Sequence, residues 1–323
     1  MRGVASEAGQ ALLTLSFVPG IGQRTLLKLA EHPKFLETNL EQMGRLLPPV
    51  ESKLTEAALT LAVDKARDNL HQAQRDGAHL LTVVDQAYPP LLRQIPDKPA
   101  FLFVKGELQR EQCVAVIGTR EPTPHGVEIT RRATTYLAER GWSVVSGLAL
   151  GVDAMAHQTA LEAGGHTVAV LAHGLQTVAP RQHAALAERI LEQGGALVSE
   201  YPYGVGVFPA QFVKRDRTQA GLAQGVLMIQ TDVKGGSLHA SRASIEYERP
   251  LAVPMPTKRD MDAGELKVQG NLHLLGESRE AAQLLKCREA DLKHLVPLTS
   301  REDYPRFEGA METSSSQTPT RLL

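Results

Sequence analysis

The sequence is poor in aromatic residues and shows no excess of charge of either sign. Aromatic residues make up 4% of the 323 residues, so few side chains are available to stack on nucleobases. The 35 basic and 36 acidic residues give a net charge of −1, which excludes a polybasic protein whose whole surface neutralises phosphate. An anionic ligand such as a nucleic acid therefore needs a local cluster of positive side chains.

Cysteine pairs and long hydrophobic runs are also missing. Cys113 and Cys287 are the two cysteines, and their spacing fits neither a disulfide framework nor a metal site, which favours a reducing compartment. The N-terminus has no apolar run long enough for a signal peptide or a membrane span. We therefore expect a soluble, cytoplasmic protein with no membrane partner, and its length predicts about two domains.

Short apolar runs rich in Val, Ile and Leu recur from residue 113 onward, and their starts lie 24 to 29 residues apart. Each run is too short for a helix and suits a strand buried on both faces. Helix-like stretches separate the runs, which predicts an α/β fold with a doubly wound, mostly parallel, Rossmann-like sheet. The expected strands are 114–117, 143–146, 167–171, 196–199, 225–229 and 251–254, and the expected helices are 127–140, 153–163, 181–193, 216–223 and 238–246.

The regions on either side of this pattern are different in character. Helical periodicity without strand-like alternation predicts a small all-helical domain over 1–80, of the helix-hairpin-helix or SAM-like type. The proline-rich stretch 85–106 predicts a connector that ends in an edge strand at 101–104. We assign 81–287 to the Rossmann-like domain and 288–323 to a short C-terminal extension, with a disordered Ser/Thr-rich tail from Glu308 onward.

Three glycine-bearing loops follow predicted strands, at the edge where open parallel sheets bind their ligands. Glycine lets the backbone approach a phosphate, and a helix N-terminus offers unpaired N–H groups. Each loop alone is more simply a tight turn capped by Asp153 or Ser237, but three loops together with Arg120 favour an anion site. The loops contain Gly118, Thr119 and Arg120; Ser146, Gly147 and Gly151; and Gly235, Gly236 and Ser237.

A short basic run supplies the local positive cluster that the balanced net charge requires. Lys214, Arg215 and Arg217 stand within four positions, on a predicted loop at the same edge of the sheet. The alternative is a solvated charged turn in which Asp216 partly cancels the field. The sequence does not decide between these two interpretations.

The segment 18–22 lies between two predicted helices and is typical of a helix-hairpin-helix turn. In such a turn Gly20 and Gly22 leave backbone N–H groups free to meet a DNA phosphate. A hairpin that only packs fits equally well, because the nearest basic residues are Arg24 and Lys28. Both interpretations stay open.

Catalytic constellations are scarce. Asp153 and His157 lie four apart on one predicted helix face, the spacing that an acid–base pair could use. A helix cap and a histidine at the polar rim explain them more simply. The sequence contains no HExxH motif, no Ser/His/Asp order and no metal cluster among its scattered histidines, so we expect no catalytic and no metal-binding residues.

A series of motifs runs in order through residues 85–275. It contains Y-P-x-L-L from Tyr88, G-T-R from Gly118, S-G-x-A-x-G-V-D from Ser146, K-R-x-R from Lys214, G-S-L from Gly236 and G-N-x-x-L from Gly270. In order and spacing this series resembles the DNA-processing protein family DprA, also called Smf. The predicted N-terminal hairpin resembles the helical domain that precedes the Rossmann-like domain in many members.

The resemblance implies a protein that binds and protects single-stranded DNA during natural transformation and helps to load a RecA-type recombinase, commonly as a homodimer. It implies neither catalysis nor a cofactor. It assigns DNA contacts to the cations Arg120, Lys214, Arg215 and Arg217, and the shaping of the pocket to Gly118, Thr119, Ser146, Gly147, Gly151, Gly235, Gly236 and Ser237. With few aromatic residues, affinity is expected to depend mainly on phosphate contacts and therefore on salt.

Three positions depart from the family pattern, and two other functions stay open. Asp216 stands where the family usually has Asn, and Met255 and Glu248 stand where it has Gly, which implies a divergent member. A nucleotide-binding sensor or phosphoribohydrolase-like enzyme of the same superfamily would use the loop 234–237 with Glu246. A protein-interaction scaffold with a vestigial pocket is the third possibility.

Overall fold

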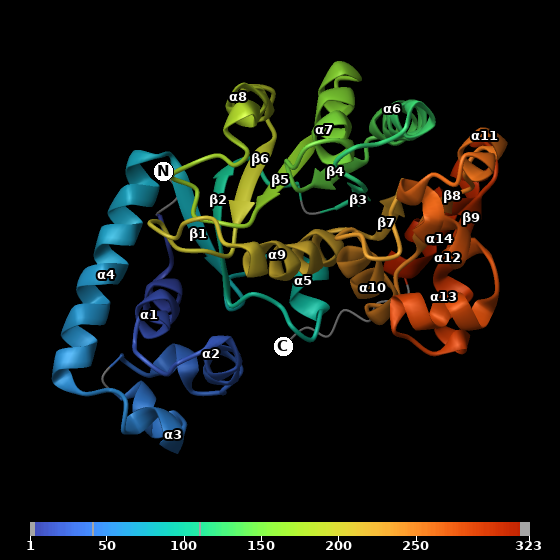
Figure 1. Ribbon diagram of the computed structural model, residues 1–323. Helices are drawn as coiled ribbons and strands as arrows, with labels where there is room; N and C mark the ends of the chain where they lie inside the picture. The colour runs from blue at the N-terminus through green and yellow to red at the C-terminus, as the bar shows by residue number, and fades with distance from the viewer. Residues whose placement is uncertain (1–3, 41, 110, 317–323) are drawn as a thin grey trace. The chain divides into compact units, whose positions relative to one another are not determined.

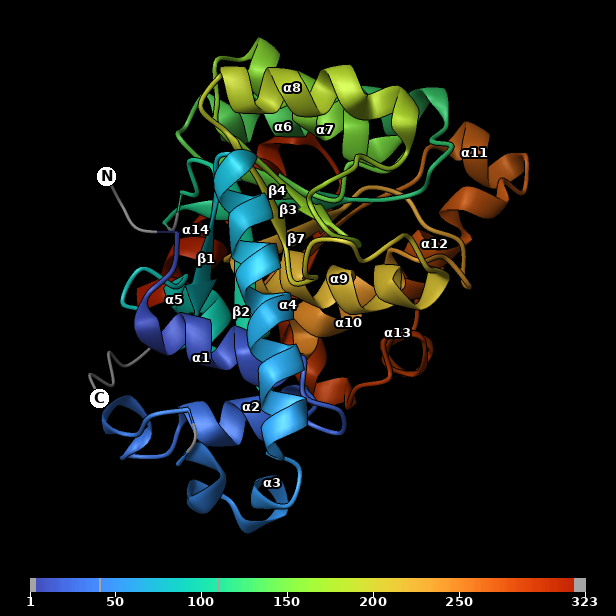
Figure 2. The same ribbon diagram turned by 90° about the vertical axis from the view of Figure 1, so that its left-hand side faces the viewer.

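The computed structural model describes residues 4–40, 42–109 and 111–316 (Figures 1 and 2). The chain forms two compact units. Unit 1 comprises Met1–Gly106, His173–Thr177 and Val198–Gly206, and unit 2 comprises Glu107–Ala172, Val178–Leu197 and Val207–Leu323. None of the helices in the described part of the chain combines the length and the apolar character that a membrane span requires.

Unit 2 is built on a parallel sheet with the strand order β5-β4-β3-β7-β8-β9. From β3 the chain adds β4 and β5 on one side, and from β7 it adds β8 and β9 on the other. The direction of winding therefore changes between β3 and β7, which is where open α/β sheets form their ligand crevice. The strands are β3 (Cys113–Ile117), β4 (Ser143–Ser146), β5 (Thr167–Leu171), β7 (Gly225–Met228), β8 (Leu251–Pro254) and β9 (Leu295–Leu298).

The strands of this sheet confirm the predicted α/β class and its mostly parallel, doubly wound sheet. Every residue of β3, β4, β5, β7 and β8 is buried, which explains why each strand reads as a continuous apolar run. The observed bounds of these strands and of β6 (Ala196–Ser199) differ from the predicted ones by at most one residue at either end. Strand β9 is an addition that the sequence pattern did not indicate.

Helices cover both faces of the sheet in unit 2. Figures 1 and 2 show α6, α7 and α8 over one face and α9 and α10 over the other. Helix α6 begins where Thr123 caps it, with the Thr123 side chain accepting a hydrogen bond from the Gly126 backbone N–H. These helices are α6 (Pro124–Ala138), α7 (Val152–Glu162), α8 (Ala184–Glu192), α9 (Pro209–Leu222) and α10 (Leu238–Glu246), followed by α11 (Lys258–Asp262), α12 (Gln269–Leu275), α13 (Ser278–Leu285) and α14 (Tyr304–Ser316).

The C-terminal helix α14 corrects the predicted disorder from Glu308 onward. Phe307 and Met311 are buried in the core of unit 2 together with Trp142. The Glu308 carboxylate accepts hydrogen bonds from the Tyr136 hydroxyl at 2.7 Å and from Trp142 Nε1 at 3.0 Å. The Ser/Thr-rich composition predicts disorder, but the side chains of Phe307, Glu308 and Met311 lie on one side of the helix and anchor it to unit 2. Residues 317–323 lie outside the described residues.

Unit 1 contains the N-terminal helices and two strands. Strand β1 pairs antiparallel with β2, and β6 follows β2 in the strand order, so β2 is not the predicted edge strand. This unit extends past the predicted domain boundary at residues 80 and 81, because β1 packs on α4 and pairs with β2. Its elements are α1 (Glu7–Ser16), α2 (Gln23–Ala30), α3 (Pro48–Glu51), α4 (Glu56–Arg75), β1 (Ala78–Thr82), α5 (Pro90–Gln94) and β2 (Phe101–Gly106).

Candidate phosphate-binding pocket

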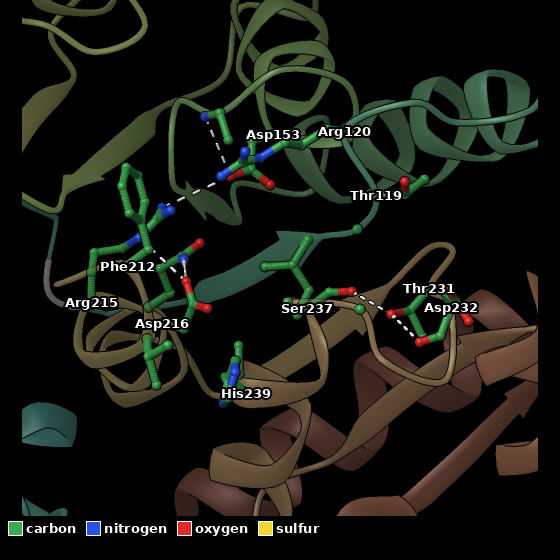
Figure 3. A pocket seen from close by; sticks show the side chains of 18 residues that line it. Thr119, Arg120, Asp153, Phe212, Arg215, Asp216, Thr231, Asp232, Ser237 and His239 are labelled. Carbon is green, nitrogen blue, oxygen red and sulfur yellow. Dashed lines mark hydrogen bonds and ion pairs between the residues drawn. The ribbon is translucent and has the colours of Figure 1, made fainter. Parts of the chain in front are cut away.

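A pocket of about 400 Å³ opens in unit 2 at the carboxyl ends of β3 and β7. It lies at the change of winding direction, where the strand order predicts a ligand crevice. Figure 3 shows Phe212, Arg215 and Asp216 of α9 on one side of it and Thr231, Asp232 and Ser237 on the other. Its wall is completed by Ile117, Gly118, Thr119, Arg120, Ala149, Asp153, Val213, Gln219, Gly235, Gly236, His239 and Ala240.

The glycines of the first two loops allow close packing between those loops. A Cβ added to Gly118 would lie 2.7 Å from Cγ2 of Val152. Gly151 has a φ of +74°, and a Cβ there would lie 2.4 Å from the carbonyl oxygen of Arg120. Both glycines are therefore required for tight turns, and Gly118 also lines the pocket.

The third loop, before α10, presents backbone to the pocket. Gly236 is exposed, and no atom lies within 4 Å of a Cβ added there. A Cβ on Gly235, by contrast, would lie 2.2 Å from Thr231 Oγ1, and the Ser237 hydroxyl donates a hydrogen bond to that same oxygen at 2.8 Å. The loop is therefore held by Thr231, and its open side at Gly236 leads into the N-terminus of a nine-residue helix.

Ser146 and Thr119 occupy different environments although both were assigned to the site. Ser146 is fully buried, and its hydroxyl donates a hydrogen bond to the Val116 carbonyl oxygen at 2.7 Å, so it does not line the pocket. Thr119 does line the pocket, and its backbone N–H donates to the Gln230 carbonyl oxygen at 2.9 Å. The structure therefore brings Thr119 to the site and places Ser146 beneath it.

The basic run lies inside helix α9, which corrects the predicted loop. Lys214 is exposed, Arg217 is half-buried, and neither lines the pocket. Arg215 lines the pocket from the inside and is 4% exposed. The helix begins at Pro209, because proline is well suited to the first helical position, where its missing N–H has no partner to lose.

Arg215 is the centre of a buried ion cluster. Its Nη1 lies 3.8 Å from Oδ2 of Asp153 and donates a hydrogen bond to the Val170 carbonyl oxygen at 3.3 Å. Its Nε lies 3.3 Å from Oδ1 of Asp216. The guanidinium fits because position 147 is glycine: a Cβ on Gly147 would lie 1.2 Å from Nη1. Gly147 thus leaves space for the Arg215 guanidinium, and it does not line the pocket.

Asp153 and His157 are both buried, and of the two Asp153 lines the pocket. Burial raises the pKa of the Asp153 carboxyl, while the charge of Arg215 lowers it. Burial, together with Arg215, lowers the pKa of His157 to about 3, and His157 Nδ1 lies 2.6 Å from the Thr167 hydroxyl. The expected rim position of His157 is wrong, because helix α7 turns this face toward the sheet. Within residues 4–40, 42–109 and 111–316, no group of three His, Cys, Asp or Glu side chains could hold a metal ion.

Arg120 is the exposed cation of the pocket. Its Cζ lies 5.8 Å from the centre of the Phe212 ring, and Cζ of Arg215 lies at the same distance from that ring. A guanidinium over an aromatic face keeps its hydrogen-bond donors free for an oxyanion while the ring supports its flat face. The pair Arg120 and Phe212 can therefore hold a phosphate oxygen beside an aromatic surface.

The sequence interpretation missed Phe212, Gln219, Thr231, Asp232 and His239, all of which line the pocket. A helix starting at Pro209 would have placed Phe212, Arg215 and Gln219 on one face, because their spacing is three and four. Met255, where the family pattern has glycine, is not among the lining residues.

The N-terminal hairpin lies in unit 1. Gly20 has a φ of +80°, as a turn glycine between α1 and α2 should, and the Ile21 N–H donates to the Val18 carbonyl oxygen at 3.1 Å. Lys53 Nζ donates a hydrogen bond to the Gly20 carbonyl oxygen at 2.6 Å. A cation from a distant part of the sequence thus lies at the turn, while Gly22 has no atom within 4 Å of an added Cβ.

Comparisons with known proteins find relatives that carry the name Smf. It is 42% identical to protein Smf of Escherichia coli over 181 residues, 55% of this chain and 48% of that protein. It is 33% identical to protein Smf of Synechocystis over 283 residues, 83% of this chain and 68% of that protein. The chain thus spans about half the length of the E. coli relative and two thirds of the cyanobacterial one.

Solved structures show the same fold. The X-ray structure of DNA processing protein A from Streptococcus pneumoniae matches with a TM-score of 0.70 at 23% identity, over 92% of this chain and 97% of that one. The structure of DNA processing protein A from Helicobacter pylori, described by its single-stranded DNA binding mode, matches with a TM-score of 0.55 over 75% of this chain and 97% of that one, also at 23% identity. The sequence model of DNA recombination-mediator protein A matches residues 79–290, and the chain belongs to that family.

Proposed function

We propose that this chain binds single-stranded DNA and holds a phosphate of the strand in the pocket between β3 and β7. The observation that carries the proposal is the exposed guanidinium of Arg120 facing the same pocket as the open backbone at Gly236. A guanidinium and a helix N-terminus both donate hydrogen bonds to phosphate oxygens in many proteins.

Aromatic and apolar side chains on α9 favour a single strand over a duplex. Phe212 lines the pocket, Phe208 is 59% exposed, and Val213 is 46% exposed, all within the first turns of the helix or at its N-cap. Unpaired bases can stack on such surfaces, whereas a duplex keeps its bases inside. Phosphate contact and base contact thus occur on one side of α9.

The family supports the wider assignment. We propose that the chain is a binding protein without catalytic activity, acts in the cytoplasm during transformation or recombination, pairs as a homodimer and delivers strands to a RecA-type recombinase. With a balanced net charge, several subunits on one strand would be needed for tight binding. We propose that the family domain spans 81–287, flanked by 1–80 and 288–323; the family match over 79–290 supports this division, whereas the compact units of the structure divide the chain differently.

A nucleotide-binding or phosphoribohydrolase-like function is the second candidate, because a pocket of about 400 Å³ also suits a mononucleotide. Its expected glutamate, Glu246, is the exposed last residue of α10. The residues of that helix that line the pocket, His239 and Ala240, lie about 10 Å away along the helix axis at 1.5 Å per residue. This position argues against hydrolysis in the pocket.

Binding to a labelled single strand and to a duplex of equal length, measured over a salt series, tests the proposal. We expect tighter binding to the single strand and a linear fall of log affinity with log salt, because each phosphate contact releases a counterion. Equal affinity for both DNA forms would contradict it. A thermal shift with mononucleotides, accompanied by product release, would favour the second candidate.

A further inference from the structure

The walls of the pocket carry more carboxylates than guanidinium groups. Arg120 and Arg215 line it together with Asp153, Asp216 and Asp232. A phosphate adds further negative charge, and like charges repel strongly in a partly desolvated site. The affinity of the pocket for phosphate therefore depends on how much of this negative charge is neutralised.

The positive charge of Arg215 is already paired with carboxylates of the protein. Its guanidinium lies 3.3 Å from a carboxylate oxygen of Asp216 and 3.8 Å from one of Asp153, and its side chain is 4% exposed. One buried cation thus faces two carboxylates, and full ionisation of the three groups leaves an excess negative charge in the interior. Proteins relieve such a charge by binding a proton, and the two carboxylates share that titration.

Asp216 is the most exposed member of this cluster. Its side chain is 14% exposed at the pocket wall, against 9% for Asp153. Gln219 Nε2 donates a hydrogen bond to Asp216 Oδ1 at 3.0 Å, which fixes the carboxyl beside Arg215. Burial raises the pKa of Asp216 to about 7; the charge of Arg215 lowers it and that of Asp153 raises it.

We infer that Asp216 takes up a proton when the pocket binds a phosphate, so that the affinity of this chain for single-stranded DNA falls as the pH rises through neutrality. The inference rests on the proposed function. A protonated carboxyl is neutral and can donate a hydrogen bond to a phosphate oxygen, whereas a carboxylate can only accept. The same residue thus sets both the strength and the pH dependence of binding.

The other charged and titratable groups around this pocket come from the loops after β3 and β7 and from α7 and α10. Arg120 lies close enough to lower the pKa of Asp216, and Asp232 faces the pocket from the loop after β7. On α10, burial lowers the pKa of His239, so its imidazole is neutral at pH 7 and above. On α7, burial lowers the pKa of His157 to about 3, so its imidazole is neutral between pH 6 and pH 8.

The direction and size of the effect follow from linkage. A carboxyl with a raised pKa is protonated below about pH 7, so binding that requires this proton is strongest on the acid side. If one proton accompanies binding, the affinity of the wild type falls about tenfold between pH 6 and pH 8. Asp216→Asn keeps the shape and removes the titration, so its affinity should vary less than about twofold and exceed that of the wild type at pH 8.

Fluorescence anisotropy tests this with an oligonucleotide that lacks terminal phosphates and carries a label insensitive to pH between 6 and 8. The proteins are the wild type, Asp216→Asn and the matched control Asp232→Asn, which removes another pocket carboxylate and should keep the slope of the wild type. Calorimetry in two buffers of different ionisation enthalpy should show proton uptake by the wild type at pH 7.5 and none by Asp216→Asn.

One result would contradict the inference about Asp216, and a different result would contradict the proposed function. If the wild type binds the strand with the same pH dependence as Asp216→Asn, and calorimetry shows no proton uptake, the inference is wrong and the proposed function stands. If none of the three folded proteins binds single-stranded DNA at any pH, the proposed function itself is wrong.

Discussion

Replacing Arg120 with alanine is expected to weaken binding to single-stranded DNA by about 10- to 100-fold, the loss that follows from removing one charge-assisted phosphate contact. Arg120 is exposed and rests over the Phe212 ring, so its removal should leave the fold intact. The slope of log affinity against log salt should also become shallower by about 0.7, because one phosphate contact fewer releases one counterion fewer. Anisotropy titrations at four salt concentrations measure both quantities.

Arg132→Ala is the matched control for this experiment. Arg132 lies on α6 of the same unit, its side chain is 66% exposed, and it pairs with Glu128 on the helix surface. It does not line the pocket. If Arg132→Ala weakens binding as much as Arg120→Ala does, general surface charge and not the pocket accounts for the affinity.

Replacing Gly147 with alanine is expected to lower the free energy of unfolding by about 3 kcal/mol or more, because an overpacked core and a displaced buried charge each cost in this range. The added Cβ would lie 1.2 Å from Nη1 and 2.3 Å from Cζ of Arg215. The guanidinium would have to leave Asp153 and Asp216, which would then face each other without a cation. Urea unfolding followed by circular dichroism measures the change.

Gly236→Ala is the control for the glycine substitution itself. Gly236 has no atom within 4 Å of an added Cβ, so the free energy of unfolding should change by less than about 1 kcal/mol. A Gly147→Ala protein as stable as this control would mean that Arg215 does not occupy the position against Gly147.

The buried position of Arg215 changes how substitutions in the basic run are interpreted. Arg215→Ala would leave Asp153 and Asp216 uncompensated in the interior, a change that typically costs several kcal/mol. Loss of DNA binding in that protein could follow from unfolding alone. Arg120 separates the two effects, because it faces the pocket and is not part of the buried cluster.

The strands and the position of the crevice were predictable from sequence for a simple physical reason. A parallel strand covered on both faces must be apolar at nearly every position, as in residues 114–117, and its crossover helix sets a regular spacing. Strand β1 and strand β9 lack this signature. β1 is buried at alternate residues, and β9 contains Pro297 and is mostly half-buried.

The role of the basic run was not predictable, because it depends on residues far away in the sequence. The sequence shows three cations in four positions, but it does not show that Gly147 leaves space for one of them or that Asp153 provides its counter-charge. Helix α9 starts at Pro209 and not at the predicted residue 216, because proline is favoured at the first helical position. A helix from Pro209 onward separates Lys214 and Arg217 from the pocket wall.

The most direct test of strand binding in the pocket is photocrosslinking of a bromodeoxyuridine-substituted single strand, with the crosslinked peptides identified by mass spectrometry. We expect crosslinks in three segments of the pocket wall, 117–121, 209–219 and 231–240, and their loss in Arg120→Ala. Crosslinks confined to residues 18–25 of the hairpin, with none in these three segments, would contradict it.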